Sequence, residues 1–121
     1  MYVLDTNVFI YQAGGDEAVV SFFEEHAHGV FYLPSIVVAE FLSYPLITDS
    51  SIDSFKRLVS QMITVSLDFA IAEQAATLRR THRTKLADSI IAATALVIRA
   101  PLLTRNTRDF KRITELKIVD V

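Results

Sequence analysis

Four acidic residues, far apart in the chain, are candidates for a shared chemical site: Asp5, Glu40, Asp88 and Asp109. Grouped carboxylates repel one another, which raises their pKa values, and a divalent cation reverses that effect. An all-oxygen ligand set suits Mg²⁺ or Mn²⁺ better than Zn²⁺. Such a site activates a bound water and stabilises charge on phosphoryl oxygens. The acids therefore predict a divalent-metal site that hydrolyses phosphodiester bonds.

Helix capping is the competing interpretation for three of these acids. Asp5, Asp88 and Asp109 each stand near the expected start of a helix, where an aspartate accepts hydrogen bonds from unpaired backbone N–H groups. Taken singly, Asp88 and Asp109 are better explained as caps. A metal site becomes the stronger interpretation only if all the acids meet.

Glu40 is not explained as a helix cap, because its neighbours in the sequence are apolar and no basic residue is close to it. On a helix it shares a face with Ile36 and Val37, and no Lys or Arg occurs between Tyr2 and Phe55. An ionised carboxylate among apolar side chains is costly without a counter-charge. We therefore expect a cation from solution to supply that charge.

The elements that must position these acids follow a strand–helix alternation. Five short apolar runs are expected to be strands: Tyr2–Leu4, Phe31–Leu33, Ile63–Leu67, Pro101–Thr104 and Lys117–Val121. Amphipathic or apolar segments between them predict helices, and the most apolar helix, after Asp88, is expected to be central because alanines allow close packing around it. This alternation predicts an α/β fold with a parallel sheet covered on both faces. Ligands of such sheets bind beyond the carboxyl ends of the strands, where Asp5, Glu40 and Asp109 are expected.

Helix boundaries follow from capping residues and breakers. Asp16, Ser35 and Asp68 are expected N-caps, Asp88 is expected to open its helix, and Gly29 is expected to end the second helix.

Composition narrows the classes of protein. With 121 residues, 51% of them hydrophobic, the chain fits one domain spanning residues 1–121. No cysteine is present, which excludes disulfides and thiolate metal sites. No apolar run is long enough for a membrane span and no signal peptide is evident, so a cytoplasmic location is expected. The mean hydropathy of +0.35 predicts that a second copy or a partner covers some apolar surface.

Charge is near balance, at −2, but unevenly distributed. Two basic stretches flank Asp88 and Asp109: the first is Arg79, Arg80, Arg83 and Lys85, and the second is Arg105, Arg108, Lys111 and Arg112. The candidate RNA-binding residues are Arg79, Arg80, Arg83, Lys85, Arg105 and Arg108. A solvated helix face is the simpler interpretation of either stretch.

Four sequence blocks, in order, resemble the PIN-domain nucleases and look most like the VapC-type toxins of toxin–antitoxin pairs. The blocks are Val3–Val8, Leu33–Glu40, Leu86–Leu96 and Leu103–Phe110. The resemblance covers essentially the whole chain, and departures are small: a short Thr84–Ala87 stretch before Asp88 and no appended segment.

The resemblance implies a three-layer α/β/α fold with a five-stranded parallel sheet, a homodimer and a Mg²⁺- or Mn²⁺-dependent endoribonuclease. Asp5, Glu40 and Asp88 match the family's invariant acids, and Asp109 matches a more variable fourth acid. By the same resemblance Asp5 and Asp88 are the main metal ligands, while Glu40 and Asp109 bind through water or position the attacking water. Polar residues that orient the acids or the metal waters are matched by Thr6, Ser35, Thr104 and Asn106.

Several functions stay open on sequence grounds. A toxin would need an antitoxin, whose segment would occupy an apolar groove. A PIN ribonuclease in RNA processing would need none, and a non-catalytic RNA- or partner-binding module would gain by losing the acids. A signalling receiver domain would use Asp68 as phospho-acceptor, but it also needs a Lys after the fifth strand, and the chain ends at Val121.

Overall fold

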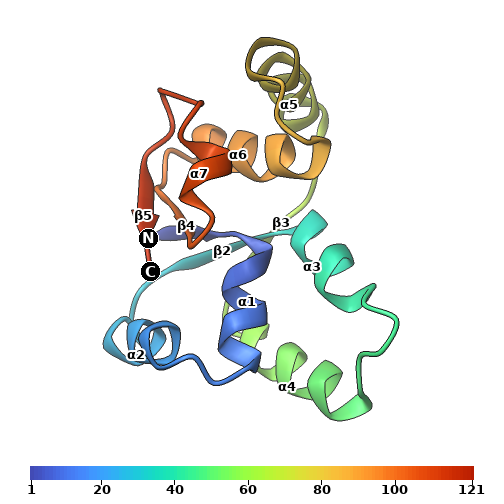
Figure 1. The fold of residues 1–121 in the computed structure, drawn as a ribbon, viewed down its shortest axis with the longest axis vertical. Coiled ribbons are helices and arrows are strands. Elements are labelled where there is room, and N and C mark those ends of the chain that lie inside the picture. The colour runs from blue at the N-terminus through green and yellow to red at the C-terminus, as the bar shows by residue number, and fades with distance from the viewer.

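A five-stranded parallel sheet forms the centre of the computed structural model, which describes residues 1–121 (Figure 1). Its strands run in the order β3-β2-β1-β4-β5. Their bounds are β1 (Tyr2–Leu4), β2 (Phe31–Pro34), β3 (Ile63–Val65), β4 (Leu102–Thr104) and β5 (Ile118–Asp120). The predicted parallel α/β sheet is confirmed, with strands trimmed by a residue or two at several ends.

Burial on both faces of the sheet explains why the central strands are continuously apolar. Val3 of β1 pairs with Tyr32 of β2 on one side and with Leu102 of β4 on the other. Val3, Leu4 and Leu102 are fully buried because both faces of the sheet are covered. The chain order reverses between β1 and β4, so the carboxyl ends of these two strands flank the crevice where such sheets bind ligands.

Seven helices surround the sheet: α1 (Thr6–Ala13), α2 (Glu17–Glu25), α3 (Ser35–Leu42), α4 (Asp49–Val59), α5 (Phe69–His82), α6 (Leu86–Ile98) and α7 (Thr107–Phe110). Figure 1 shows α1, α2 and α4 on one side of the sheet and α5 and α6 on the other. Helix α3 follows β2 directly and contacts both α1 and α6. A membrane-spanning length of apolar helix is not found in the structure.

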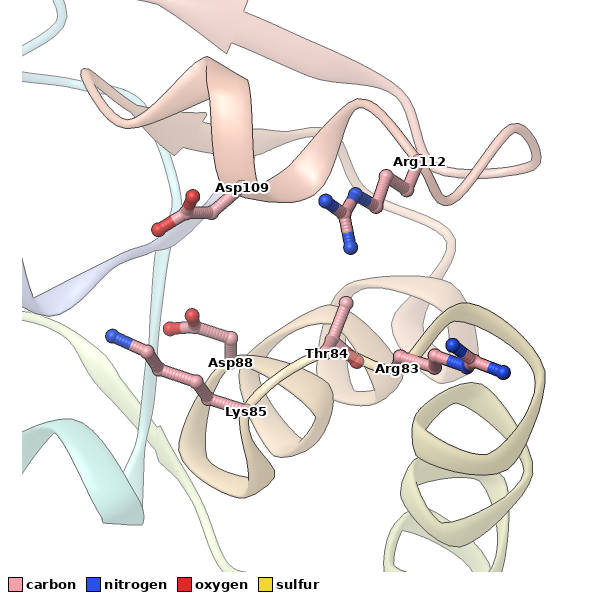
Figure 2. A pocket seen from close by; sticks show the side chains of 6 residues that line it. All are labelled: Arg83, Thr84, Lys85, Asp88, Asp109 and Arg112. Atoms are coloured by element: carbon pink, nitrogen blue, oxygen red, sulfur yellow. The ribbon is translucent and has the colours of Figure 1, made fainter.

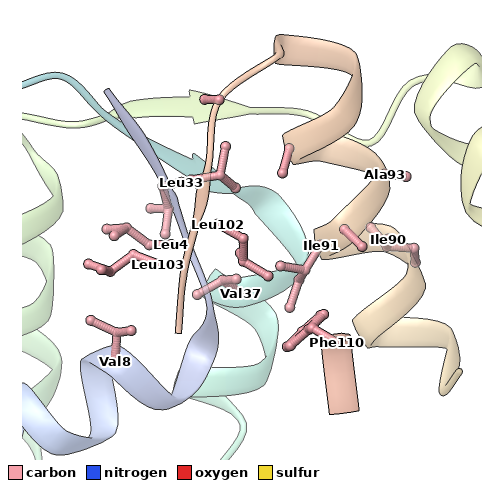
Figure 3. Close-up of a cluster of buried hydrophobic side chains, with 14 of the residues drawn as sticks. Leu4, Val8, Leu33, Val37, Ile90, Ile91, Ala93, Leu102, Leu103 and Phe110 are labelled. Carbon is pink, nitrogen blue, oxygen red and sulfur yellow. The ribbon is translucent and has the colours of Figure 1, made fainter. Parts of the chain in front are cut away.

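The core joins the central strands to α6 (Figure 3). Residues 89–95 of this helix are all buried, as the apolar sequence predicts for a central helix. Ala92 and Ala93 are fully buried, so small side chains let α6 pack closely. Leu103 of β4 and Phe110 of α7 belong to the same cluster, which ties the crevice to the core.

Two of the predicted N-caps are confirmed. Asp16 Oδ1 accepts a hydrogen bond from Val19 N at 3.2 Å, and Asp68 Oδ1 accepts one from Ile71 N at 2.9 Å. Asp68 follows the edge strand β3, away from the switch point between β1 and β4 where such sheets bind ligands, which argues against a phospho-accepting role.

Three expected boundaries are wrong. Ser35 is not an N-cap, because β2 runs into α3 without a loop and Pro34 occupies that position. The Ser35 hydroxyl instead accepts a hydrogen bond from Leu67 N at 3.2 Å. Helix α6 begins at Leu86, so Asp88 lies in its first turn, and α2 ends at Glu25, well before Gly29.

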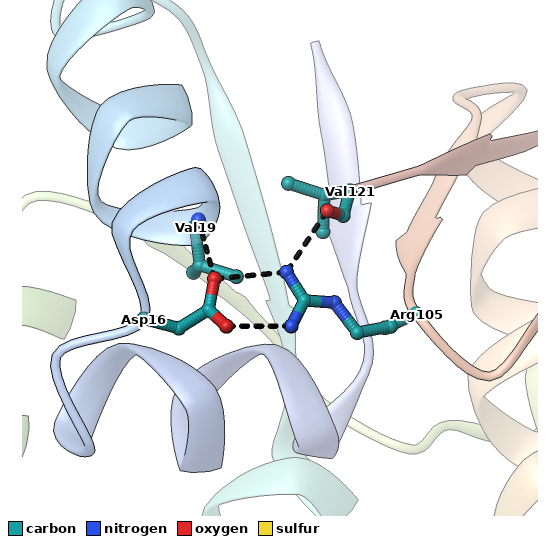
Figure 4. A network of polar contacts seen from close by, with 4 residues as sticks. All are labelled: Asp16, Val19, Arg105 and Val121. Carbon is teal, nitrogen blue, oxygen red and sulfur yellow. Dashed lines mark hydrogen bonds and ion pairs between the residues drawn. The ribbon is translucent and has the colours of Figure 1, made fainter.

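An ion pair joins the start of α2 to the segment after β4 (Figure 4). Arg105 donates from both terminal nitrogens to Asp16, at 2.7 and 2.9 Å, and donates to the Val121 carbonyl at 2.9 Å. The guanidinium also lies 4.3 Å from the centre of the Tyr11 ring. These hydrogen bonds lower the pKa of Asp16 from its ordinary 3.8 to about 2.

Asp16→Asn tests this pair, because asparagine caps a helix as well as aspartate but carries no charge. A lowered pKa in the folded state means that the stabilisation is complete above about pH 4 and is lost as the pH falls towards 2. We expect a lower melting temperature at pH 7 and a difference that vanishes near pH 2. Asp53→Asn, on the exposed surface of α4, is the matched control. Equal melting curves at pH 7 would contradict the role of the pair.

Candidate active site

Asp5 is the buried centre of the site. It follows β1, caps α1 and is only 4% exposed. Its Oδ1 accepts a hydrogen bond from Thr6 N at 2.8 Å, and its Oδ2 accepts one from the Thr104 hydroxyl at 2.7 Å. Thr104 is itself buried at the end of β4 and accepts a hydrogen bond from Asn106 N at 2.9 Å. Both carboxylate oxygens are therefore held in one orientation.

The electrostatics of Asp5 are those of a carboxylate without a counter-charge. Burial raises its pKa to about 6 in spite of the hydrogen bonds from Thr104 and Thr6, and the charges of Asp88 and Glu40 raise it further. No Lys or Arg forms an ion pair with it. A cation at this position would relieve both burial and repulsion.

Glu40 reaches the site from the second turn of α3. Its Oε1 accepts a hydrogen bond from the Thr6 hydroxyl at 2.6 Å, which joins α3 to α1. The expectation that Glu40 lies among apolar side chains is wrong, because Val37 takes the buried face of α3 and Glu40 is exposed. Its place beside Thr6 and Asp5, rather than burial, makes it a site residue.

Asp88 and Asp109 face each other across a pocket (Figure 2). Neither caps its helix: Lys85 and Asn106 hold the cap positions of α6 and α7. Asp88 is half-buried, and burial raises its pKa, helped by the charges of Asp109 and Glu40 and opposed by Lys85. Asp109 is exposed and accepts a hydrogen bond from Asn106 Nδ2 at 2.7 Å.

The four acids lie at one edge of the sheet, but their side chains do not meet closely enough to form a complete set of metal ligands. The charges of Asp88 and Glu40 raise the pKa of Asp5, and the charges of Asp109 and Glu40 raise the pKa of Asp88. The four carboxylates are therefore close enough to repel one another. No three His, Cys, Asp or Glu side chains meet closely enough to hold an ion. Glu40 and Asp109 are exposed, and exposed side chains change rotamer readily. The oxygen donors present fit a hard divalent cation in their chemistry.

Three of the four polar residues expected to support the acids do hydrogen-bond to one of them. Thr6, Thr104 and Asn106 each donate a hydrogen bond to one of the acids. Ser35 does not, because its hydroxyl faces the Leu67 backbone.

Only some of the candidate RNA-binding residues lie beside the acids. Arg83 and Lys85 line the pocket with Asp88 and Asp109, and Arg79 lines a shallower pocket beside it. Arg80 is exposed on α5, where it hydrogen-bonds Thr77, and Arg108 is exposed on α7. Arg105 does not join them, since its guanidinium is bound to Asp16.

Arg112 is the residue that sequence reasoning missed. It belongs to the second basic stretch, but it was not among the expected RNA-binding residues, and it lines the pocket with Asp88 and Asp109. Its position was the available signal, because Arg112 lies only three residues after Asp109.

Comparison with known proteins agrees with this geometry. The family model described as PIN domain matches residues 2–116. The chain belongs to the PIN domain family. A curated relative, Ribonuclease VapC of Rickettsia bellii (strain RML369-C), is 56% identical over 34 residues, which are 28% of this chain and 25% of that protein. The matched segment thus spans about a quarter of the relative's length.

Solved structures share the PIN fold over the whole chain. VapBC2 from Rickettsia felis, bound to a promoter DNA fragment, has a TM-score of 0.87 at 22% identity and covers 99% of this chain and 98% of its own. A toxin–antitoxin complex from Klebsiella pneumoniae has a TM-score of 0.83 at 25% identity, with all of both chains covered. The predicted family and its five-stranded α/β fold are therefore confirmed.

Proposed function

We propose that this PIN domain is a metal-dependent endoribonuclease that hydrolyses RNA phosphodiester bonds and acts as the toxin of a toxin–antitoxin pair. The observation that carries the proposal is Asp5, a buried carboxylate oriented by two hydrogen bonds and surrounded by acids rather than by cations. It stands at the topological switch point between β1 and β4, where the fold binds ligands. Because its substrate would be cellular RNA, the proposed location is the cytoplasm.

Each side chain has a part in the proposed reaction. Asp5 and Asp88 would hold Mg²⁺ or Mn²⁺, and Glu40 and Asp109 would bind through water or position the attacking water. The ion, when bound, would lower the pKa of a water and stabilise charge on the phosphoryl oxygens. Thr104 and Thr6 keep the Asp5 carboxylate in place, and Asn106 orients Asp109.

A groove beside Glu40 supports an antitoxin partner. It has a volume of about 670 Å³ and lies between α1 and the segment after α3. Its lining includes Tyr44 and Leu46, which are 58% and 76% exposed, and Glu40 itself. An amphipathic segment in this groove would cover apolar surface and reach the acids, which suits an inhibitor. The structural neighbour from K. pneumoniae is a toxin–antitoxin complex by name, which agrees with this interpretation.

A homodimer is proposed on a different surface. Strand β3 is an edge of the sheet, and near it Ile63, Leu67 and Phe69 are 51%, 45% and 81% exposed. Exposed apolar side chains on an open edge strand favour pairing with a second copy.

The central test is RNA cleavage by the purified protein. With Mg²⁺ or Mn²⁺ we expect discrete cuts in cellular RNA, and with EDTA none, because the acids alone cannot activate water. Mapping new 5′ ends in cells that express wild type, Asp88→Asn or the surface control Asp53→Asn locates the sites. Cuts that persist in EDTA, or in Asp88→Asn at the wild-type rate, would refute the proposal.

Growth separates the toxin from a ribonuclease of RNA processing. A toxin arrests growth when expressed, and a small protein encoded beside it relieves the arrest. RNA cleavage without growth arrest would favour the processing role.

A further inference from the structure

The pocket that contains Asp88 and Asp109 has a positively charged end. Its volume is about 190 Å³, and its lining is polar throughout: Arg83, Thr84, Lys85, Asp88, Asp109 and Arg112. Figure 2 shows the two carboxylates and Lys85 at one end and the Arg112 guanidinium turned towards them from the other, while the Arg83 side chain points away from the carboxylates. Arg112 reaches in from the segment after α7, and Arg83 stands on the α5–α6 loop.

The two arginines are free to bind an anion. Arg105, with Asp16, is the only Arg or Lys that forms an ion pair with a carboxylate, so neither Arg112 nor Arg83 is neutralised. Both side chains are exposed. A guanidinium carries a permanent charge and a planar set of donors that suits a phosphate.

The loop that carries Arg83 is held rigidly. The Thr84 hydroxyl is buried and hydrogen-bonds the Ser89 hydroxyl, and the Thr84 carbonyl accepts a hydrogen bond from Arg79 Nη1 at 3.0 Å. Arg83 itself has a φ of 56°, a left-handed conformation that costs a non-glycine residue energy and persists only where its surroundings enforce it. A fixed loop loses little entropy when a ligand binds.

We propose that Arg112 binds the RNA phosphate next to the one that is cleaved, and that Arg83 contacts the strand on the adjoining surface. This inference rests on the proposed function, because the neighbouring carboxylates define where the cleaved phosphate lies. The adjoining shallow pocket, lined by Arg79, Arg83, Thr84 and Lys85, continues the positive surface away from the acids. The RNA strand therefore leaves the site along the α5–α6 loop.

Binding without cleavage tests the inference. In an Asp5→Asn background, a fluorescein-labelled single-stranded 12-nucleotide RNA of mixed sequence is titrated and its anisotropy followed. Arg112→Gln is expected to weaken binding about 3- to 10-fold at 0.1 M salt, and Arg83→Gln somewhat less. The slope of log K against log salt should fall by about 0.7 for each phosphate that the variant no longer neutralises. Lys56→Gln, an exposed cation on α4, is the matched control.

Kinetics distinguish phosphate binding from a merely structural role. In the active protein, Arg112→Gln should raise KM about 3- to 10-fold with little change in kcat or melting temperature, and Arg112→Lys should restore most of the affinity. Arginine variants that bind RNA with the affinity and salt slope of the Lys56→Gln control would overturn the inference. Because the anisotropy assay needs no cleavage, an inactive wild type would refute the proposed function while leaving this binding result interpretable.

Discussion

Asp5→Asn is expected to abolish RNA cleavage in a protein that still folds. The loss should be at least about a hundredfold, equal to about 2.7 kcal/mol of transition-state stabilisation. The amide keeps the size of the side chain and can still meet Thr6 and Thr104, but it brings no negative charge to a cation. Activity is measured as the initial rate of cleavage of the mapped RNA at saturating Mg²⁺, with Asp53→Asn as the control.

The same substitution should stabilise the metal-free protein at neutral pH. The pKa of Asp5 is raised from 3.8 to about 6, so the folded state binds a proton more tightly than the unfolded state. Stability contributed by protonated Asp5 is present below about pH 4 and is lost as the pH rises to about 6. Above that pH the ionised carboxylate costs roughly 1–3 kcal/mol, and asparagine removes this cost.

Urea unfolding in EDTA at pH 5 and pH 7.5 measures this effect. Wild type should lose stability between the two values relative to Asp5→Asn. A variant that unfolds more easily than wild type at pH 7.5 would show that the hydrogen bonds from Thr6 and Thr104 outweigh the burial of the charge. If the Asp5→Asn protein is folded and cuts RNA within threefold of wild type, Asp5 is not a metal ligand.

Local sequence signals predicted the parts of the fold that depend on burial. Apolar runs without alternation identify strands covered on both faces, and the apolar sequence after Asp88 identifies α6 as central. Asp16 and Asp68 cap their helices as predicted, because capping depends on neighbours only two or three residues away.

Features that depend on how distant segments pack together could not be predicted from the sequence. Glu40 is exposed because contacts with α1 set the rotation of α3, and the apolar neighbours of Glu40 along the chain do not report that rotation. Arg105 and Arg112 belong to one basic stretch, yet Asp16 binds the first while the second faces the acids. Asp16 lies 89 residues before Arg105, so no local pattern reveals the pair.

The acids of the site lie between two different surfaces, an apolar groove on one side and a positively charged pocket on the other. Glu40 lines the apolar groove, whereas Asp88 and Asp109 line the pocket that ends at Arg112. Under the proposed function, a partner segment and the RNA would approach the same acids from different sides. An inhibitor in the groove would then act at the metal site without needing to resemble RNA.

Phe110→Ala is expected to lower the free energy of unfolding by about 3–5 kcal/mol, the range for loss of a buried phenylalanine. Phe110 is fully buried in the core cluster and is the last residue of α7. A helix of four residues cannot persist by itself, so this anchor is what positions Asp109 and Arg112 on either side of it.

Phe110→Ala should also reduce cleavage by the molecules that remain folded. At a temperature where Phe110→Ala remains folded, we expect cleavage to fall at least tenfold, because Asp109 and its partner Asn106 lose their fixed position. Leu46→Ala, at a side chain 76% exposed, is the control and should change stability by no more than about 0.5 kcal/mol. Urea titration gives both free energies. If Phe110→Ala unfolds within about 1 kcal/mol of wild type and cuts RNA normally, α7 does not depend on the core, and Asp109 must be positioned by its hydrogen bond to Asn106 alone.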